Sequence, residues 1–332
     1  MKKVSIFKII FFIVILIFFS SCKRKESFDE VLNSDEKIVY LETHDKSSSR
    51  GAGYFMDVVI LDLKTLKKYY ITNDIFRDES PAISNDGKYI SFFSAREGEP
   101  LILRIQGLGA PRKLYLFNSE TKRFRKISDV DFMNNRWDNV YFYKDTTEFI
   151  FPITNMTEVD SIKESVKTFN VKTGTEKLLK KIDDDLDFRK MIISTNKNIM
   201  VLGCYKIIVV WNVRTGEEFR IHIPEGAYIG GIDKTGDKFL YCTFKTHQLF
   251  EYNITKRSSS KIELPKNGLA FPVNWSDFYY TKDGNIIGIA SDVYVPDDDG
   301  KREIVEYNVK TKKYKFITKD GLQKYSLIYW HR

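Results

Sequence analysis

A β-hairpin is predicted for residues 80–94, which read Ser80-Pro81-Ala82-Ile83-Ser84-Asn85-Asp86-Gly87-Lys88-Tyr89-Ile90-Ser91-Phe92-Phe93-Ser94. The Asn-Asp-Gly step supplies the positive φ that a tight reversal of the chain requires. An apolar, β-rich run follows this turn directly. Weaker copies of the pattern occur at residues 232–241 and 280–287, and degenerate copies at residues 145–151 and 196–201. A strand-turn-strand unit therefore recurs along the chain.

A second unit alternates with the first. It is an apolar strand that ends on Asn or Asp and continues into a short polar turn. The six terminal residues are 56, 52, 42, 41 and 55 residues apart, and they are Asp62, Asn118, Asn170, Asn212, Asn253 and Asn308. Two hairpins in a period of this length are typical of one four-stranded blade of a β-propeller. The repeat therefore predicts an all-β fold with one blade per period.

The hairpin at residues 80–94 closely resembles the Ser-Pro-Asp-Gly repeat of TolB-like β-propellers. This repeat also forms the propeller domains of some serine peptidases. The resemblance covers essentially residues 37–332, and it implies a propeller for this whole part of the chain. Trp211-Asn212 additionally resembles the Trp-Asp ending of WD repeats. The motif is specific for the fold and says little about activity.

The two ends of the repeat region are complementary. Residues 37–41 match the second strand of a blade, so the first blade lacks its innermost strand. Residues 327–330 supply a β-rich strand that no further turn residue follows. We predict that residues 327–330 pair beside residues 38–42, because closing the ring removes two exposed strand edges. The expected fold is a six-bladed β-propeller of four-stranded antiparallel blades, closed by the C-terminal strand.

The first 21 residues are typical of an export signal. Lys2, Lys3 and Lys8 flank an apolar run over residues 9–19, which is too short to span ~30 Å of hydrocarbon as a helix. The run ends in Phe19-Ser20-Ser21-Cys22, which resembles the lipobox of bacterial lipoproteins. The resemblance implies a lipid attached to Cys22 after cleavage and a location on the outer membrane. The alternative is an ordinary secretory signal in which Cys22 is incidental.

The charge of the chain limits the class of partner. The 332 residues include 53 Lys and Arg against 45 Asp and Glu, and residues 1–21 contribute three Lys, so the net charge falls from +8 to +5 without them. The basic residues are spread through hairpin turns, so no nucleic-acid partner is expected. Residues 22–36 are polar and are interpreted as a tether. Cys204 and Cys242 lie in predicted buried strands and are interpreted as free thiols, with a disulfide as the alternative.

No motif of a known catalytic centre occurs in the chain. It contains no Gly-x-Ser-x-Gly elbow, no phosphate loop, no His-Glu-x-x-His and no Cys pair at metal-ligand spacing. About two dozen residues follow Asn308, too few for a peptidase domain. Two acidic runs, residues 183–187 and 297–299, are interpreted as solvated turns rather than calcium loops. No metal site or cofactor is predicted, because the four histidines fall at different ends and radii of the ring: His44, His222, His247 and His331.

Loop lengths distinguish the two faces of the predicted ring. Turns after the first and third strands of a blade are short, whereas connections after the second and fourth strands are long and varied. Long loops on a rigid scaffold usually carry binding residues. The Arg and aromatic residues there suit recognition of a protein or an anionic ligand, although the Arg side chains could also only solvate the loops. The predicted contact residues are Arg96, Arg136, Trp137, Tyr205 and Trp275, and Arg50, Arg77, Arg112 and Arg189 lie on the same face.

Together these observations predict a lipid-anchored propeller that acts as a binding or scaffold module at the cell envelope. The resemblance to TolB-like proteins implies another envelope protein as its partner. No catalytic residue is predicted. The alternative is a glycan-active lyase or hydrolase with a site in the central funnel. Three or more ionisable side chains in contact within that funnel would favour the enzyme.

Overall fold

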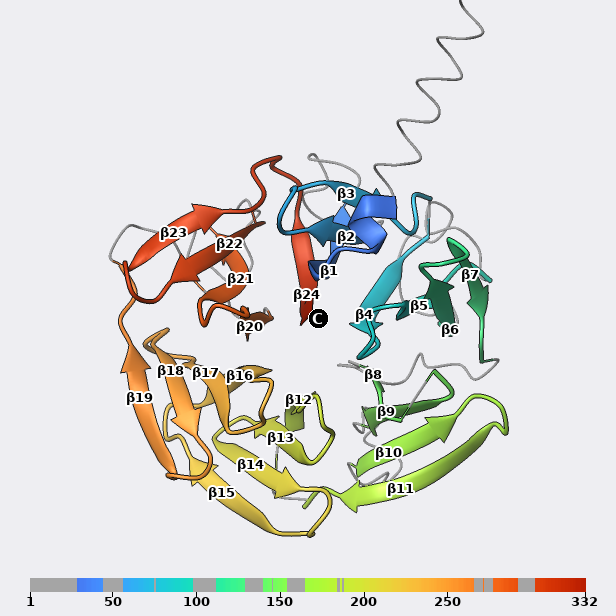
Figure 1. The fold of residues 1–332 in the computed structure, drawn as a ribbon. Helices are drawn as coiled ribbons and strands as arrows, with labels where there is room; N and C mark the ends of the chain where they lie inside the picture. The colour runs from blue at the N-terminus through green and yellow to red at the C-terminus, as the bar shows by residue number, and fades with distance from the viewer. Residues whose placement is uncertain are drawn as a thin grey trace, which may run out of the picture.

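The computed structural model contains six antiparallel sheets arranged as a ring (Figure 1). Each sheet has four strands, so the predicted six-bladed β-propeller is confirmed. The structure describes residues 29–43, 56–74, 76–97, 112–128, 140–144, 146–153, 165–183, 186, 188–265, 271, 277–291 and 302–332.

Each blade is one sheet. We count its strands from the centre of the ring outward, so the first strand is innermost and the fourth lies at the rim. From the centre outward, blade 1 contains β24 (Lys324–His331), β1 (Glu36–Thr43), β2 (Met56–Asp62) and β3 (Lys68–Tyr70). Blade 2 contains β4 (Asp78–Ile83), β5 (Tyr89–Ser94), β6 (Lys113–Asn118) and β7 (Arg123–Lys126). Blade 3 contains β8 (Tyr141–Phe142), β9 (Glu148–Ile153), β10 (Ser165–Asn170) and β11 (Thr175–Lys181).

The remaining blades follow in chain order. Blade 4 contains β12 (Phe188–Ile193), β13 (Ile199–Cys204), β14 (Ile207–Asn212) and β15 (Glu218–His222). Blade 5 contains β16 (Ala227–Ile232), β17 (Lys238–Thr243), β18 (Leu249–Asn253) and β19 (Ser258–Ile262). Blade 6 contains β20 (Phe278–Tyr280), β21 (Ile286–Ser291), β22 (Arg302–Asn308) and β23 (Lys313–Phe316).

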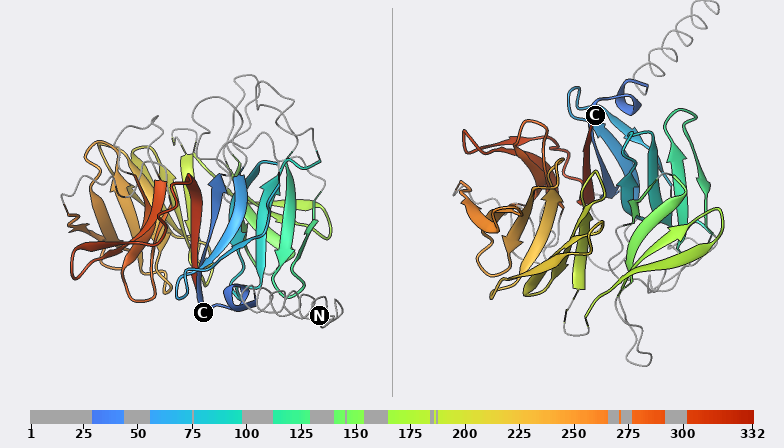
Figure 2. Two further views of the ribbon diagram at one scale, coloured as in Figure 1. Left: turned by 90° about the horizontal axis from the view of Figure 1, so that it is seen from above. Right: turned by 60° about the horizontal axis from the view of Figure 1, so that its bottom comes forward.

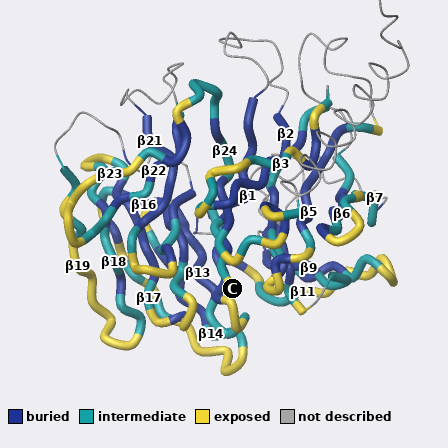
Figure 3. The backbone as a smooth tube through the Cα atoms, turned by 45° about the horizontal axis from the view of Figure 1, so that its top comes forward, coloured by how far each residue is buried: buried dark blue, intermediate teal, exposed yellow. Residues whose placement is uncertain are grey.

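Burial decreases from the middle of each blade to its outer edge (Figure 3). All residues of β2 and β21 are buried, whereas β15 and β19 are exposed or half-buried throughout. The middle strands pack against a neighbouring blade on each side, which explains why they are near-continuous apolar runs. Six clusters of buried apolar residues were found in the described part of the chain, and each joins two adjacent blades. The core is therefore itself a ring.

The strands end on two opposite faces of the ring (Figure 2), and most connections between consecutive strands contain more residues on one face than on the other. Turns after the first and third strands of each blade gather on one face, which we call the tight-turn face. Connections after the second and fourth strands gather on the opposite face, which we call the long-loop face. Because each inner strand runs from the long-loop face to the tight-turn face, the ends of all inner strands meet at one mouth of the central channel.

The recurring Asn or Asp at the end of each third strand holds the turn that follows it. In blade 4 the side-chain oxygen of Asn212 accepts hydrogen bonds from the backbone N–H of Arg214 and Thr215, at 3.0 and 3.1 Å. The corresponding residues of the other five blades accept backbone hydrogen bonds in the same way. Such bonds satisfy turn N–H groups that the sheet leaves unpaired. The six residues that set the sequence period are thus turn-forming residues.

The C-terminal strand β24 closes the ring by pairing with β1, from Glu36 opposite His331 to Glu42 opposite Lys324. This is the pairing predicted from the sequence. At the tight-turn face the indole Nε1 of Trp330 donates a hydrogen bond to the carbonyl oxygen of Asn85, at 3.0 Å. The Trp330 ring therefore contacts the turn of the 80–94 hairpin, which joins the last strand of the chain to blade 2.

Lys37 connects three segments beside this contact. Its amine donates hydrogen bonds to the carbonyl oxygens of Leu32 and Gly87, at 2.7 and 3.1 Å, and lies 4.8 Å from the centre of the Trp330 ring. Burial lowers the pKa of Lys37 to about 8. Within the described residues the amine has no carboxylate in hydrogen-bond contact, so backbone carbonyls and the indole face stabilise its charge.

A buried ionic cluster fixes the other end of β24. The amine of Lys324 is fully buried, lies 3.4 Å from the Glu42 carboxylate, and donates a hydrogen bond to Asp320. Lys68 bridges Glu42 and Asp320. Burial alone would raise the pKa of Asp320, but the hydrogen bonds from Lys324 and Lys68 lower it to about 2. Charges from three strands and one loop of blades 1 and 6 thus meet where the ring closes.

The N-terminal part of the described chain differs from the predicted tether. Residues 29–32 form a single helical turn at the tight-turn face, and Val31 and Leu32 are buried in the cluster between blades 1 and 2. Two adjacent apolar residues are too few to show a period in the sequence, so this packing could not be recognised there. The last part of residues 22–36 therefore belongs to the propeller. No helix in the described part of the chain has the length and apolarity needed to cross a membrane.

Cys204 and Cys242 are both buried and are not joined by a disulfide. Cys204 ends β13 and Cys242 lies within β17, in different blades. Burial raises the pKa of the Cys242 thiol to about 12. This agrees with the interpretation of both residues as buried thiols that form no disulfide.

The close contact between Gly87 and Trp330 predicts that adding one methyl group at Gly87 strongly destabilises the folded protein. Gly87 has φ +72°, and a Cβ there would lie 2.5 Å from the Trp330 ring. We expect Gly87→Ala to lower the free energy of unfolding by about 3 kcal/mol, of which roughly 1 is backbone strain and the rest is overpacking. Gly174→Ala is the matched control, because Gly174 has φ +68° and no atom within 4 Å of its Cβ position. Urea unfolding that gives equal losses for both variants would contradict this account of ring closure.

Candidate functional site

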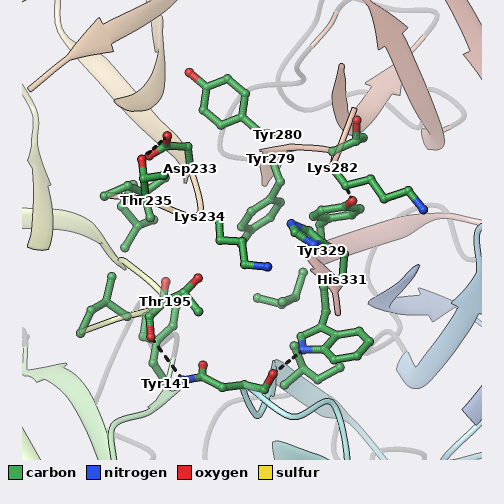
Figure 4. A pocket seen from close by; sticks show the side chains of 18 of the residues that line it. Tyr141, Thr195, Asp233, Lys234, Thr235, Tyr279, Tyr280, Lys282, Tyr329 and His331 are labelled. Carbon is green, nitrogen blue, oxygen red and sulfur yellow. Dashed lines mark hydrogen bonds between the residues drawn. The ribbon is translucent and has the colours of Figure 1, made fainter. Parts of the chain in front are cut away.

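A cavity of about 570 Å³ lies at the tight-turn mouth of the central channel (Figure 4). Its walls come from the innermost strands and from the turns that follow them in blades 2, 4, 5 and 6. The last residues of β24 complete the wall, so the pocket exists only in the closed ring. Loop lengths in the sequence instead predicted a binding region on the opposite, long-loop face. We call this cavity the central pocket.

Two carboxylates line the central pocket, and both are engaged in the fold. Asp233 Oδ1 accepts hydrogen bonds from three backbone N–H groups of its own turn, at 2.8 to 3.0 Å. Glu251 accepts one bond from the Lys238 amine at 2.9 Å and one from the Tyr280 hydroxyl at 3.0 Å. A general acid or base needs a carboxyl group that can exchange a proton with a substrate. Among the described residues, the pocket lining contains no further carboxylate that could take this role.

Four lysines line the same pocket. Lys238 pairs with Glu251, and Lys282 pairs with Glu36 at 2.9 Å. Lys234 extends into the middle of the pocket (Figure 4). Among the residues that the structure describes, no carboxylate pairs with Lys197 or Lys234. Burial lowers the pKa of Lys197 to about 8. The pocket therefore presents two amines without a paired carboxylate among the described residues, and its four lysines exceed its two carboxylates by two charges, one of which Glu36 balances.

Aromatic side chains form much of the remaining wall, and hydrogen bonds hold several of them in place. The Tyr329 hydroxyl donates to Glu36 at 2.8 Å and accepts from the backbone N–H of Lys282 at 2.7 Å. The Tyr141 hydroxyl donates to the carbonyl oxygen of Met191. Burial raises the pKa of Tyr279 well above its ordinary value. Hydrogen bonds thus hold Tyr329 and Tyr141, whereas the buried Tyr279 hydroxyl has no hydrogen-bond partner among the described residues and its phenol stays neutral at physiological pH.

The outer turns of the tight-turn face are basic. The turns after the third strands of the six blades carry nine Lys or Arg residues and two Glu residues, which are Lys64, Lys67, Lys122, Lys172, Arg214, Lys256, Arg257, Lys310, Lys312, Glu120 and Glu217. A surface that carries more charges of one sign than of the other attracts ligands of the opposite charge over distances up to about the Debye length. The outer turns of the tight-turn face therefore carry an excess of positive charge.

Most of the residues predicted as contacts lie outside the described residues. This applies to Cys22, Arg136, Trp137 and Trp275, and also to His44, Arg50, Asp297, Asp298 and Asp299. Tyr205 is described, and it occupies the turn between β13 and β14 on the long-loop face. Its side chain is 38% exposed and stacks on Phe244 with ring centres 5.4 Å apart. The Arg189 guanidinium lies 5.9 Å from the Tyr205 ring. Tyr205 is thus an exposed aromatic residue on the face where the sequence placed it.

Arg96 was predicted to contact a binding partner, but its side chain is engaged within the protein itself. Its side chain is only 11% exposed, and its guanidinium pairs with Asp74 at 2.8 Å and with Asp78 at 3.3 Å. It also lies 4.6 Å from the centre of the Phe124 ring and contacts the rings of Phe76, Phe92 and Tyr115. Arg77 and Arg112 both pair with Glu79. The sequence suggested exposed contact residues because it cannot show which loop carboxylates fold back onto an arginine.

The Arg96 environment also contains the one possible metal-ligand group found among the described residues. Oxygen atoms of Asp57, Asp74 and Asp78 lie within 4.8 Å of one another. Arg96 already supplies a positive charge to two of these carboxylates. No described histidine takes part, since His222, His247 and His331 lie on β15, in the β17–β18 turn and at the end of β24. Of the first acidic run, Asp183 is described, and it pairs with Arg220.

Comparison with known proteins shows similarity in fold alone. No family model matches the chain, and no curated protein matches it in sequence. TolB from Acinetobacter baumannii superposes with a TM-score of 0.60 at 11% identity, over 89% of this chain and 66% of TolB. The chain therefore spans about two thirds of TolB. The fold is a TolB-like β-propeller.

Other solved structures share this fold. One chain of a nidogen/laminin complex superposes with a TM-score of 0.59 at 8% identity, over 89% of this chain and 98% of that one. An oligogalacturonate lyase in complex with manganese superposes with a TM-score of 0.51 at 11% identity, over 76% of this chain and 72% of the lyase. Proteins this distant share a scaffold, so the site residues have to carry any functional argument.

Burial of Asp78 predicts an unusual dependence of stability on pH. Burial raises the pKa of Asp78 to about 7, and the Arg96 charge offsets only part of this effect. Because the folded state then holds a proton that the unfolded state releases, this group makes the free energy of unfolding fall as pH rises from about 4 to 7, by up to ~1.4 kcal/mol per pH unit. We expect Asp78→Asn to flatten this slope in urea unfolding measured from about pH 4.5 to about pH 7.5, the range over which the two states differ in protonation.

The exposed Asp283 of the β20–β21 turn provides the control. Asp283→Asn should leave the slope of the wild-type protein in place. If Asp78→Asn follows the same slope as the wild type, then Asp78 is ionised in the folded protein and Arg96 balances its charge fully.

Proposed function

We propose that this protein is an exported lipoprotein, attached through Cys22 to the outer membrane, and that its propeller binds a protein of the cell envelope. The β-propeller is consistent with a scaffold, because it presents long loops on a rigid ring. The attachment, the location and the partner are parts of this proposal. The binding surface is the long-loop face, with Arg136, Trp137, Tyr205 and Trp275 among the contact residues.

The observation that carries this proposal is the position of residues 29–35. They pack on the tight-turn face, where Asp29 pairs with Lys122 and Glu30 pairs with Lys67 at 2.6 Å. Cys22 precedes Asp29 by seven residues, which span at most roughly 25 Å when extended. A lipid on Cys22 would therefore hold the tight-turn face toward the bilayer. The long-loop face would then point away from the membrane, where a second protein can reach it.

The glycan-active enzyme is the weaker candidate. The structural similarity to an oligogalacturonate lyase extends to the scaffold only. Lys238, Glu251 and Tyr280 are three ionisable side chains in contact at the central pocket, which is the kind of convergence an enzyme requires. However, Glu251 joins β18 to both β17 and β20, and burial raises the pKa of Tyr280 far beyond its ordinary range. These contacts are those of a structural bridge between blades, and they favour binding over catalysis.

Replacement of the proposed lipid-bearing residue tests the anchor. Stable anchoring needs more than one acyl chain, and a lipidated N-terminal cysteine supplies this. We expect Cys22→Ala to move the protein from the membrane to the soluble fraction and to abolish incorporation of a radiolabelled fatty acid. Cys204→Ala is the control, because Cys204 is buried in β13. A Cys22→Ala protein that stays in the membrane fraction would show that the N-terminal segment is an ordinary signal or a different type of anchor.

Charge reversal on the long-loop face tests the binding surface. The double variant Arg136→Glu/Trp137→Ala should reduce capture of a cross-linked membrane partner at least about thirtyfold, since one Arg or Trp anchor at an interface contributes about 2 kcal/mol or more. The matched control is Arg125→Glu/Leu178→Ala, which changes two exposed residues on the outer strands β7 and β11. Quantitative cross-linking in intact cells followed by mass spectrometry measures the capture. Loss of capture in the control variant alone would place the interface on the rim of the ring.

A further inference from the structure

We propose that the central pocket binds an oxyanion, the phosphate or carboxylate group of a ligand, through the amines of Lys197 and Lys234. The binding site is a property of the closed propeller and goes beyond the proposed anchoring and partner binding. Its ligand is defined by charge and size: one or two negative oxygens bound by ammonium groups, with an attached organic part.

Charge balance inside the pocket is the first step of the argument. Each carboxylate of the lining already accepts hydrogen bonds, Asp233 from its own turn and Glu251 from Lys238 and Tyr280. Lys282 is neutralised by Glu36. The remaining amines belong to Lys197 and Lys234, and His331 at the end of β24 lines the same cavity. A cavity with this excess of positive charge is complementary to an anion.

The position of Lys197 is the second step. It lies in the β12–β13 turn with φ +60°, at the position that Gly87, Gly236 and Gly284 occupy in the corresponding turns of blades 2, 5 and 6. This turn places Lys197 in the lining of the pocket, where the residue is half-buried and burial lowers the pKa of its amine. Desolvation of an ammonium group is unfavourable unless a negative group compensates for it. A bound oxyanion would provide that compensation.

Rigidity and size form the third step. The turns that carry Lys197 and Lys234 are each held by a side chain at the turn start: Ser194 accepts a bond from the N–H of Ile199 at 3.0 Å, and Asp233 accepts its three backbone bonds. The two turns are thus fixed in position, and each presents its amine on a flexible lysine side chain. A volume of about 570 Å³ accommodates an anionic group together with an organic part that packs on the tyrosine walls.

Two sources can supply such an oxyanion. If the proposed anchor at Cys22 holds this face toward the bilayer, a lipid headgroup phosphate lies within reach of the pocket. A soluble phosphate or carboxylate compound can enter from the surrounding water. The chemistry of recognition is the same in both cases, and the experiment separates them.

The experiment uses the chain from residue 23 onward, which contains all six sheets and all six core clusters of the described structure. Sulfate is the probe, because its charge does not change between about pH 7 and pH 9.5, whereas a lysine amine with a pKa near 8 loses its proton in this range. Isothermal titration at low salt should give saturable binding at about pH 7 and a severalfold weaker affinity at about pH 9.5. Lys197→Met and Lys234→Met should each weaken binding at the lower pH about tenfold or more, the loss of roughly one charged hydrogen bond.

Lys172→Met is the matched control, because Lys172 is an exposed lysine of a turn on the same face outside the pocket. It should bind sulfate as the wild type does. Lys197→Met should also remove most of the pH dependence, a result that loss of a merely structural lysine would not produce. Equal binding by all four proteins, or no saturable binding by the wild type at neutral pH, would overturn the proposal.

Vesicles then identify the source of the oxyanion. Phosphatidylcholine vesicles with and without phosphatidic acid are sedimented with the same four proteins. Capture that requires phosphatidic acid and both pocket lysines assigns the pocket to a lipid headgroup. Capture that is equal for the wild type and the pocket variants, together with lysine-dependent sulfate binding, assigns it to a soluble anion. Neither vesicle result depends on lipidation of Cys22, so a failure of the anchor and a failure of the pocket are distinguishable.

Discussion

The pairing of β24 with β1 is the interaction on which the rest of the structure depends. It joins the last strand of the chain to the first, and it turns a linear series of blades into a closed ring. Both ends of this pairing are reinforced by side chains. Trp330 and Lys37 hold it at the tight-turn face, and Lys324 holds it at the long-loop face through Glu42 and Asp320. A slip in register would bury Lys324 without its carboxylates, which is costly because the amine is fully buried.

Closure also creates the central pocket. Six inner strands run in the same direction, so the turns that follow them converge on one mouth of the channel. The carboxylates in the pocket lining are used to hold backbone N–H groups, as at Asp233, or to bridge blades, as at Glu251. Lys197 and Lys234 have no such function among the described contacts. The anionic preference of the pocket therefore results from how tight turns are built and from how the ring brings them together.

The β-propeller scaffold does not by itself determine the function of a protein. TolB, one chain of a nidogen/laminin complex and an oligogalacturonate lyase share the fold with this chain at 8 to 11% identity. Structural similarity at this level of identity shows the fold alone. The functional argument for this chain rests for that reason on its own lysines, its own loops and the position of its N-terminal segment.

The amino-acid sequence alone was sufficient to predict the blades, which depend on local patterns, and their closure, because the repeat lacks one strand at its start and has one additional strand at its end. The Asn or Asp at each third strand and the glycine of the 80–94 hairpin act within a few residues of their own position. Partners far apart in the chain could be assigned only from the tertiary structure. Arg96 was predicted as an exposed contact, but Asp74, Asp78 and four aromatic rings surround it. Lys197 and Lys234 belong to turns of two neighbouring blades, and both line one cavity. Their spacing in the sequence does not show this, because the closed ring determines the direction in which each turn points.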